Sequence, residues 1–327
     1  MGIGSLTRRE LEARVGSVRD AFGPRAGVLE AGPGRGLRTL ELTTGAGLEA
    51  TFLVDRACDL YSLRWRGVPL GFHGAPGAGD AAFYRSEGRG WLETFSGFMV
   101  TCGLRNVGPP SGGEGMHGGI AHRRADELSV TSAWEGDGFC TTITSRHREA
   151  AILSRNLELK RTWRVRLGEP ELVMQDEITN LSFRDEHMLL LYHLNAGYPL
   201  LAADTTLAID AEPVPRDADA ETGLDAWMTM REPAVPFPEQ VFFFEGASSA
   251  AVESAELGCR LRLDWDAEQL PFATAWKDLE SGTYGLGVEP GTCHPLGREE
   301  VLASGQGRIL SAGATFTAKV HIAVDPL

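Results

Sequence analysis

The chain has 327 residues, 43 % hydrophobic and 23 % charged, which is ordinary for a globular protein with a sizeable core. Its net charge of −14, from 31 basic and 45 acidic residues, argues against nucleic acid or an anionic membrane as a partner, because both require a basic surface. Charges at Arg8, Arg9 and Glu10 interrupt any signal peptide, no apolar run is long enough to span a bilayer, and five scattered cysteines form no CxxC, so we expect a cytoplasmic protein with reduced thiols.

The chain begins with a helix signature. Thr7 and Glu10 have the spacing of a capping box, and Leu11, Val15 and Val18 follow at near-helical intervals. We therefore expect a short helical extension over residues 1–20, followed by one domain over residues 21–327.

Most of the remaining chain alternates between apolar and polar residues, which is typical of β-strands. The clearest segments that follow this pattern, or that flank a turn, are residues 60–66, 130–134, 141–145, 157–167, 172–178, 259–265 and 316–324. Few helical stretches separate them, which predicts an all-β antiparallel sandwich rather than βαβ units. Arg161 stands at an apolar position of its strand, where it either faces a cleft or pairs with a buried acid.

Three further segments are predicted to be irregular. Residues 71–79 and 107–119 are rich in Gly and Pro and indicate loops, and residues 210–238, rich in Pro, Asp and Ala, indicate a long surface excursion. No internal repeat is visible.

Two predicted strands each carry an ionisable group where an apolar residue would be ordinary. His193 lies in residues 190–195, and Glu289 lies in residues 284–291 on the same strand face as Gly285 and Gly287. A carboxylate beside two glycines indicates a groove with a base at its end, and an imidazole on a second strand makes an acid/base pair plausible. Taken alone, His193 is also compatible with a buried histidine that is satisfied by hydrogen bonds.

A second histidine, His117, lies in a loop and is flanked by glycines that permit close backbone approach or unusual dihedral angles. Histidines in such loops are more often functional than histidines at random positions.

Other chemistries lack the sequence context that they need. Residues 32–36 have the glycines of a nucleotide loop but no following helix, so a turn is the better interpretation. The spacing of the pairs His117/His122 and His187/His193 does not indicate the three convergent ligands of a catalytic zinc site. No GxSxG motif is present, so a nucleophilic serine is not indicated either. We therefore expect neither a metal site nor a cofactor.

Three blocks in this order resemble the active-site blocks of the aldose 1-epimerases, or galactose mutarotases: Met116–Gly119, Tyr192–Tyr198 and Leu286–Pro290. Residues 101–109 and the pair Trp276-Lys277 resemble a less characterised bacterial branch of that superfamily. The resemblance implies a large antiparallel β-supersandwich, galactose mutarotase-like, whose concave face binds a sugar.

The resemblance also implies roles for individual residues. Glu289 is expected to be the general base that deprotonates the anomeric hydroxyl, and His193 the general acid that protonates the ring oxygen. His117 is expected to assist by polarising or holding the ring side of the sugar. The block Val288–Thr292 departs from that of the well-characterised enzymes, so galactose or glucose is not implied as the substrate.

Polar or aromatic residues near these blocks are the candidates for substrate contacts: Arg56, Asp59, His73, Asn106, Asn195, Trp276, Lys277, His294 and Arg298. Trp276 is suited to stack on a sugar, although a strand tryptophan is more often part of a core. The guanidinium groups of Arg56 and Arg298, together with His294, are suited to bind a carboxylate, sulfonate or phosphate.

The expected function is a cofactor-independent sugar epimerase of the mutarotase type, acting on a small-molecule sugar or sugar derivative as a monomer or homodimer. A non-catalytic carbohydrate-binding or regulatory protein on the same scaffold is the alternative, since one fold hosts unrelated functions. A lyase or hydrolase acting on a glycoside is a further alternative.

Overall fold

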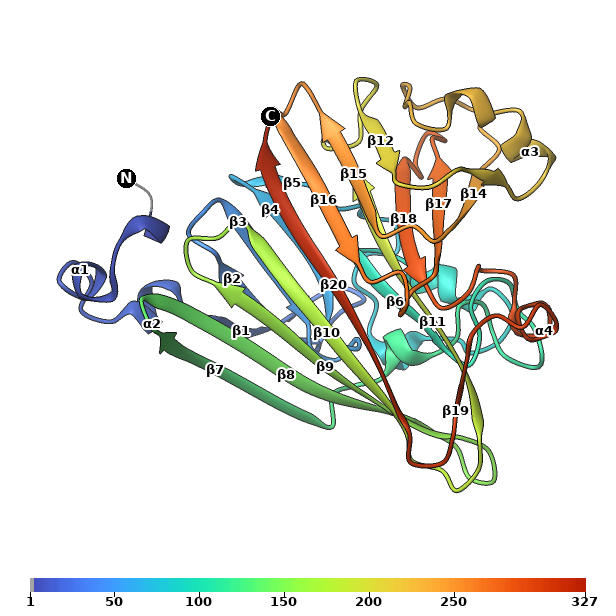
Figure 1. The fold of residues 1–327 in the computed structure, drawn as a ribbon, viewed down its shortest axis with the longest axis horizontal. Helices are drawn as coiled ribbons and strands as arrows, with labels where there is room; N and C mark the ends of the chain where they lie inside the picture. Colours follow the sequence, from blue (N-terminus) through green and yellow to red (C-terminus); the bar gives the residue numbers. More distant parts are fainter. Residues whose placement is uncertain (1–2) are drawn as a thin grey trace.

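The computed structural model describes residues 3–327 and is built mainly from antiparallel strands in three sheets (Figure 1). The largest sheet has eight strands, which in spatial order are β12 (Thr206–Ile209), β15 (Ser249–Ser254), β16 (Cys259–Trp265), β20 (Thr315–Pro326), β10 (Glu171–Asn180), β9 (Asn156–Arg166), β8 (Gly138–Ala150) and β7 (Glu127–Glu135). The second sheet has seven strands. Six of them follow the spatial order β13 (Val214–Pro215), β14 (Gln240–Glu245), β17 (Phe272–Asp278), β18 (Gly285–Gly291), β11 (Glu186–Gly197) and β19 (Arg308–Leu310). The seventh, β6 (Met99–Leu104), pairs with β11.

The third sheet has five strands in chain order: β1 (Arg25–Val28), β2 (Arg38–Thr43), β3 (Leu48–Leu53), β4 (Asp59–Trp65) and β5 (Val68–Pro69). The helices are short: α1 (Arg8–Glu12), α2 (Val18–Phe22), α3 (Ala218–Glu221), α4 (Arg298–Ala303), and the 3₁₀ turns η1 (Ile3–Ser5), η2 (Ala81–Phe83), η3 (Gly90–Thr94), η4 (Ile120–His122) and η5 (Leu224–Ala226). No helix within residues 3–327 is long and apolar enough to cross a membrane.

The predicted all-β antiparallel architecture is confirmed. The alternating segment at residues 157–167 is β9, and the segment at residues 172–178 is β10, its antiparallel neighbour. In β9 the side chains of Leu157, Leu159, Trp163 and Val165 are buried, because every second residue faces the core between the sheets.

The N-terminal extension differs from the predicted helix. The capping box of Thr7 and Glu10 is present, but α1 ends at Glu12 and Val15 lies outside any helix. The Ser17 side chain then accepts a hydrogen bond from the Asp20 backbone and caps a second helix, α2. The predicted short helical extension therefore consists of two short helices, drawn at one end of the molecule in Figure 1.

Residues 210–238 are more than a surface excursion, which corrects the sequence interpretation. They contain β13, α3 and η5, and Ala220, Trp227, Met230 and Phe237 pack into the main hydrophobic core. The elements of this segment are only two to four residues long, so no helix or strand pattern in the sequence revealed the burial of these residues.

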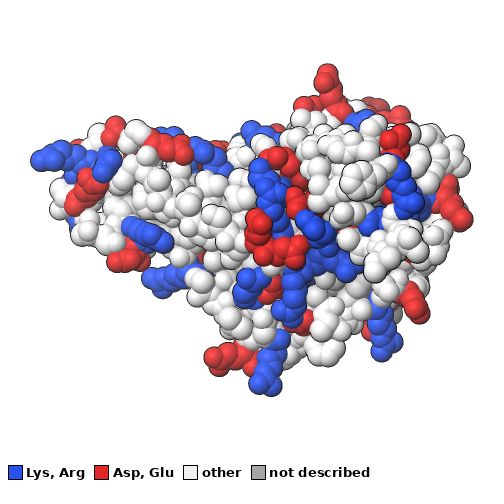
Figure 2. Space-filling view, turned by 90° about the horizontal axis from the view of Figure 1, so that it is seen from below, with Lys and Arg blue, Asp and Glu red and all other residues white. Residues whose placement is uncertain are grey.

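Charged side chains of both signs lie beside one another in the centre of the face shown in Figure 2, with broad uncharged areas around them. Ion pairs join oppositely charged residues on neighbouring strands, for example Arg146 with Glu158 at 2.5 Å and Lys160 with Glu177 at 2.8 Å. Such partly exposed pairs contribute little to stability.

One ionic group lies fully inside the core. The Arg161 guanidinium of β9 is 0 % exposed and contacts Asp59 of β4 at 2.5 Å and Asp176 of β10 at 2.6 Å. It also donates to Thr101 of β6 at 2.8 Å, and Tyr192 of β11 donates to Asp176 at 2.8 Å. Of the two sequence interpretations of Arg161, pairing with a buried acid is confirmed.

We predict that Arg161→Met lowers the free energy of unfolding by about 3–5 kcal/mol, because two buried carboxylates lose their cation. The neighbouring Lys160→Met, which removes a partly exposed pair, is the matched control and should cost less than about 1 kcal/mol. Urea unfolding of both variants measures the difference. Equal effects of the two substitutions would contradict the role assigned to Arg161.

Candidate functional site

Neighbouring strands of the seven-stranded sheet bring His193 and Glu289 together. Leu194 of β11 pairs with Val288 of β18 in antiparallel register, so the residue before Leu194 lies opposite the residue after Val288. The His193 Nε2 atom is 3.1 Å from the Glu289 Oε1 atom. On the other side of Glu289, Thr274 of β17 is its direct register partner.

These residues form the floor of a cavity of about 710 Å³, within the range of small-molecule sites. Residues 74–76 and 108–110, from the predicted Gly/Pro loops, contribute to its wall, as do Met116 and His117. Aromatic side chains enclose it: Phe72, Trp91, Phe95 and Trp276.

The glycine at position 287 makes room for the pair. A Cβ atom there would lie 2.7 Å from Glu289 Oε1, 3.1 Å from His193 Cε1 and 3.2 Å from Trp276 Cβ. Since Gly287 is a strand residue in register with both Trp276 and Asn195, any side chain would enter the cavity floor and displace its functional groups. The sequence interpretation of a glycine-lined groove beside Glu289 agrees with this geometry.

Burial shifts the pKa values of the ionisable groups on the cavity floor. The residue His193 is 5 % exposed, and desolvation lowers the pKa of His193 to about 4. Desolvation, followed by the nearby Glu239 charge, raises the pKa of Glu289 well above its usual value. The two shifts have opposite directions, and each favours the neutral form of its group.

His117 lies next to this pair, with its ring centroid 5.8 Å from that of His193 and 4.5 Å from that of Trp91. Its backbone has a φ of +53°, in the left-handed region, and the following Gly118 has a φ of +70°. This tight turn places the buried imidazole of His117 in the cavity wall, where desolvation lowers the pKa of His117 to about 3.

Two polar groups of the cavity were missed by the sequence analysis. The Trp91 Nε1 and Thr274 Oγ1 atoms are buried and have no hydrogen-bond partner among residues 3–327, although both residues line the cavity. Buried polar groups are rarely left unpaired, so each of these atoms would gain a partner if a water or a ligand hydroxyl reached it. Period-two spacing from Trp276 and Asp278 places Thr274 on the cavity face, which was the available sequence signal.

The rim of the cavity is formed by an ionic group. Trp276 Nε1 donates to Glu239 at 3.0 Å, and Glu239 in turn accepts from Arg216 at 3.1 Å. Arg216 also pairs with Asp217 at 2.6 Å, so its charge is compensated. Arg216 lies in the segment 210–238 and was not anticipated from the sequence.

Several predicted contact residues lie outside the cavity. Arg56 is buried and donates to the carbonyl oxygens of Gly79, Ala121 and Thr94, while Asp59 belongs to the Arg161 group. His73 is exposed, with its ring 5.4 Å from Tyr61. Within residues 3–327, Arg56 and Asp59 are occupied by contacts inside the protein, and none of the three side chains lines the cavity.

Asn106, Lys277 and His294 also have other partners. The Asn106 amide donates to the carbonyl oxygens of Pro109 and Gly115 at 2.8 Å, which shapes the loop that carries His117. Lys277 points to the opposite face from Trp276 and donates to the carbonyl oxygens of residues 226 and 229. His294 stacks on Phe243 with ring centroids 4.3 Å apart.

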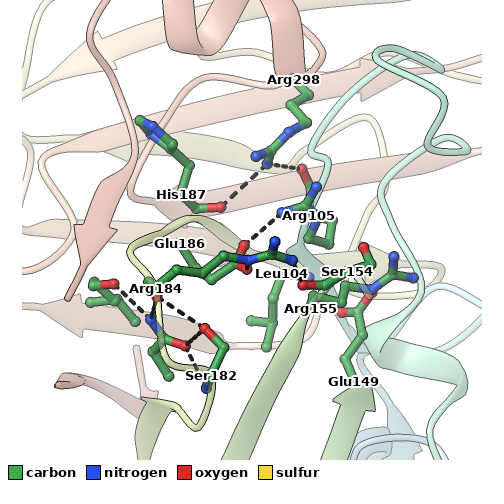
Figure 3. Close-up of polar contacts among 12 residues, drawn as sticks. Leu104, Arg105, Glu149, Ser154, Arg155, Ser182, Arg184, Glu186, His187 and Arg298 are labelled. Atoms are coloured by element: carbon green, nitrogen blue, oxygen red, sulfur yellow. Dashed lines mark hydrogen bonds and ion pairs between the residues drawn. The ribbon is translucent and has the colours of Figure 1, made fainter. Parts of the chain in front are cut away.

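Arg298 lies in an ionic group at the base of β11 (Figure 3). Its guanidinium donates to the carbonyl oxygens of Arg105 at 2.7 Å and His187 at 3.3 Å, and Arg105 pairs with Glu186 at 2.9 Å. Figure 3 also shows that Arg184 reaches Ser154, whose carbonyl oxygen accepts its hydrogen bond. Arg184 pairs with Glu186, so these contacts connect the neighbouring turns to Arg298 of α4. Of the nine predicted contact residues, Asn195 and Trp276 lie at the pair: Trp276 lines the cavity and Asn195 contacts His193.

Comparison with protein families gives one match. Residues 34–324 match the family described as "Domain of unknown function (DUF4432)". The chain belongs to this family. No curated protein matches it.

Solved structures of galactose mutarotase-like proteins share the fold of this DUF4432 chain. A Klebsiella pneumoniae protein, provisionally described as an aldose 1-epimerase, is 23 % identical with a TM-score of 0.84, covering 92 % of this chain and 83 % of its own. A galactose mutarotase-like protein from Clostridium acetobutylicum is 11 % identical with a TM-score of 0.61, covering 94 % and 99 %. At these identities the likeness shows the fold, and it confirms the predicted galactose mutarotase-like sandwich.

We predict that Glu289→Gln stabilises the DUF4432 chain at pH 8 and that the gain over the parent protein increases between pH 5 and pH 8. Folding raises the pKa of Glu289 above the usual 4.5, so the buried carboxyl favours the fold at low pH and this contribution is lost as the pH rises. Glutamine does not titrate. Urea unfolding across this pH range measures the difference, which should not diminish with rising pH.

Proposed function

We propose that the protein interconverts the anomers of a sugar by acid/base ring opening at His193 and Glu289. The observation that carries the proposal is the 3.1 Å contact between these groups on the floor of the cavity. In a cyclic sugar, the hydroxyl oxygen and the ring oxygen are bonded to the same anomeric carbon. Two adjacent proton-exchanging atoms match that pair of oxygens.

The reaction moves one proton off the sugar and returns one to it. Glu289, as the carboxylate, takes the proton of the anomeric hydroxyl, while His193, as the imidazolium, gives its Nε2 proton to the ring oxygen. The bond between the anomeric carbon and the ring oxygen breaks, leaving an open-chain aldehyde. Rotation about the adjacent carbon–carbon bond and the reverse transfers give the other anomer, so no net proton is consumed.

The charged forms needed for these transfers arise within the pair. The carboxylic acid of Glu289 and the neutral imidazole of His193 hold one proton between them, and its transfer across their hydrogen bond gives carboxylate and imidazolium. Placing both groups on rigid strands keeps the exchanging atoms within reach of the sugar. Positioned acid/base groups of this kind contribute about 10²–10⁴ in rate.

His117 and the unpaired atoms of Trp91 and Thr274 support binding of hydroxyl groups. The backbone N–H of Gly108 donates to His117 Nδ1 at 3.4 Å, so the neutral ring carries its proton on Nε2 as a donor. Trp91 adds an indole donor, and Thr274 adds a hydroxyl beside Glu289. The cavity lining carries the carboxylates of Glu239, Asp278 and Glu300 against the guanidinium groups of Arg89 and Arg216. Arg216 is paired with Glu239 and Asp217, so acids outnumber bases and an uncharged sugar is favoured over a sugar acid or phosphate.

Anomer exchange followed by NMR saturation transfer tests the proposal across neutral aldoses, sugar acids and sugar phosphates. The protein is expected to accelerate exchange of at least one neutral sugar, and Glu289→Gln and His193→Gln should each reduce the rate by about 10²-fold or more. The matched control is Glu171→Gln, which removes the carboxylate of a partly exposed pair with His321 at 2.9 Å.

Three outcomes would contradict the proposal. Binding without exchange in the parent protein would favour a carbohydrate-binding role. Unchanged rates in both variants would refute the assigned residues. Release of a new reducing end, or of an unsaturated product absorbing in the ultraviolet, would indicate a hydrolase or a lyase.

We predict that Thr274→Val lowers kcat/KM by about tenfold, the effect of losing one hydrogen bond to a sugar hydroxyl. Because the Oγ1 atom has no partner within residues 3–327, the substitution should not lower the free energy of unfolding. Exchange kinetics and urea unfolding on the same variant separate the two effects. A loss of stability with unchanged kcat/KM would show that Thr274 has a structural role only.

A further inference from the structure

The carboxamide of Asn195 has a fixed orientation. Its Nδ2 group donates to the carbonyl oxygens of Gly97 at 3.1 Å and His193 at 2.9 Å, and neither carbonyl can donate in return. The amide oxygen therefore points toward the His193 ring, where it contacts Nδ1. Asn195 is fully buried, and rotating the amide would place two donors or two acceptors against each other.

An acceptor at Nδ1 decides where His193 carries its proton. The amide oxygen cannot donate, so the Nδ1 atom must be protonated for this contact to be a hydrogen bond. The Nε2 atom then meets Glu289 Oε1 at 3.1 Å, and a hydrogen bond between them requires one proton, on either atom. With a proton on both there would be a clash, and with a proton on neither the two lone pairs would face each other.

We propose that Asn195 is a positioning residue that holds His193 in the Nδ1–H form, so that His193 and Glu289 share a single proton that rests on Glu289 in the free protein. This inference rests on the proposed function for its catalytic meaning, but its physical content can be measured without turnover. It makes the pair a reversible proton carrier. Glu289 first passes the shared proton to His193 Nε2. The carboxylate then receives a proton from the anomeric hydroxyl, and Nε2 releases its proton to the ring oxygen.

An amide suits this task better than a carboxylate. A carboxylate at position 195 would stabilise the imidazolium and retain the proton on His193, whereas the neutral amide orients the ring without adding charge. The other charged or titratable groups around the pair are His117, which burial keeps neutral, the compensated Arg216–Glu239 pair at the rim, and the buried Cys102 thiol, whose pKa is raised. The direction of the pKa shifts of His193 and Glu289 agrees with a proton resting on the carboxyl group.

Two other histidines supply references for the measurement. The Nδ1 atom of His147 contacts the carbonyl oxygen of Arg123 at 3.0 Å, which requires the Nδ1–H form, and the pKa of His147 is lowered to about 4 by burial. The Nδ1 atom of His117 accepts the Gly108 N–H, which requires the Nε2–H form. One spectrum therefore contains a neutral reference for each tautomer.

The test is long-range ¹H–¹⁵N NMR of the full chain with labelled histidines at pH 7, which distinguishes the two neutral tautomers and the imidazolium. His193→Gln identifies the His193 signals by their absence. The wild-type His193 is expected to show the pattern of His147. An Nε2–H pattern like that of His117, or an imidazolium pattern, would overturn the proposal.

Two variants test whether Asn195 is the cause. Asn195→Leu removes the acceptor and should shift His193 to the Nε2–H form, which donates to Glu289 Oε1 while the carboxyl proton lies on Oε2. Asn195→Asp keeps an acceptor and adds charge, and should give the imidazolium. If either variant is too unstable to study, the wild-type spectrum and the other variant still decide. An unchanged tautomer in Asn195→Leu would show that Asn195 does not set it.

Anomer exchange separates this inference from the proposed function. If both hold, Asn195→Leu lowers kcat by about 10²-fold with a smaller change in KM, because the pair is no longer protonated correctly for the transfers. If the parent protein exchanges no sugar while His193 has the Nδ1–H form, the proposed function fails and the proton placement stands. If the parent protein exchanges sugar anomers normally while His193 has the Nε2–H form, the proposed function stands and the proton placement fails.

Discussion

The buried guanidinium of Arg161 is the interaction on which the arrangement of the sheets depends. It lies where the three sheets meet: Asp59 comes from the five-stranded sheet, Asp176 from the eight-stranded sheet, and Thr101 from the seven-stranded sheet. The Tyr192 hydroxyl joins the same group through Asp176. Side chains alternate along a strand, so fixing Tyr192 on the core face of β11 directs His193 to the cavity face, and a slip of one residue would exchange the two. The position of the candidate catalytic histidine is thus set by a salt bridge in the core.

The core and the cavity use buried polar groups in opposite ways. Around Arg161, charges are compensated by several partners, which gives one geometry and little freedom. On the cavity floor desolvation shifts the pKa values of Glu289 and His193 toward their neutral forms, and the Trp91 and Thr274 atoms have no partner within residues 3–327. The first arrangement specifies a fold. The second leaves hydrogen-bonding capacity for a ligand and a proton that can move.

Much of this could be predicted from the sequence, for identifiable reasons. Period-two alternation identified the strands, and glycines next to His117 and Glu289 marked positions where backbone or ligand must approach closely. Proximity in the sequence was a poorer guide, because Lys277 and Arg298 lie near the recognised block at residues 286–290 but bind carbonyl oxygens elsewhere. Thr274 and Trp91 are ordinary residue types, and only three-dimensional packing shows that their polar atoms have no partner in the part of the chain that the structure describes. The rim residue Arg216 lies in a segment whose strand and helices are only two to four residues long, so its tertiary position had no signature in the sequence.

The placement of two indoles has a practical consequence. Trp91 and Trp276 both line the cavity, while the seven tryptophans of the chain include others, such as Trp163, that are packed in the core. A molecule that enters the cavity changes the polarity around the first two and displaces water from them. Intrinsic fluorescence should therefore report occupancy directly, which allows unlabelled compound libraries to be screened for the natural ligand before any turnover assay exists.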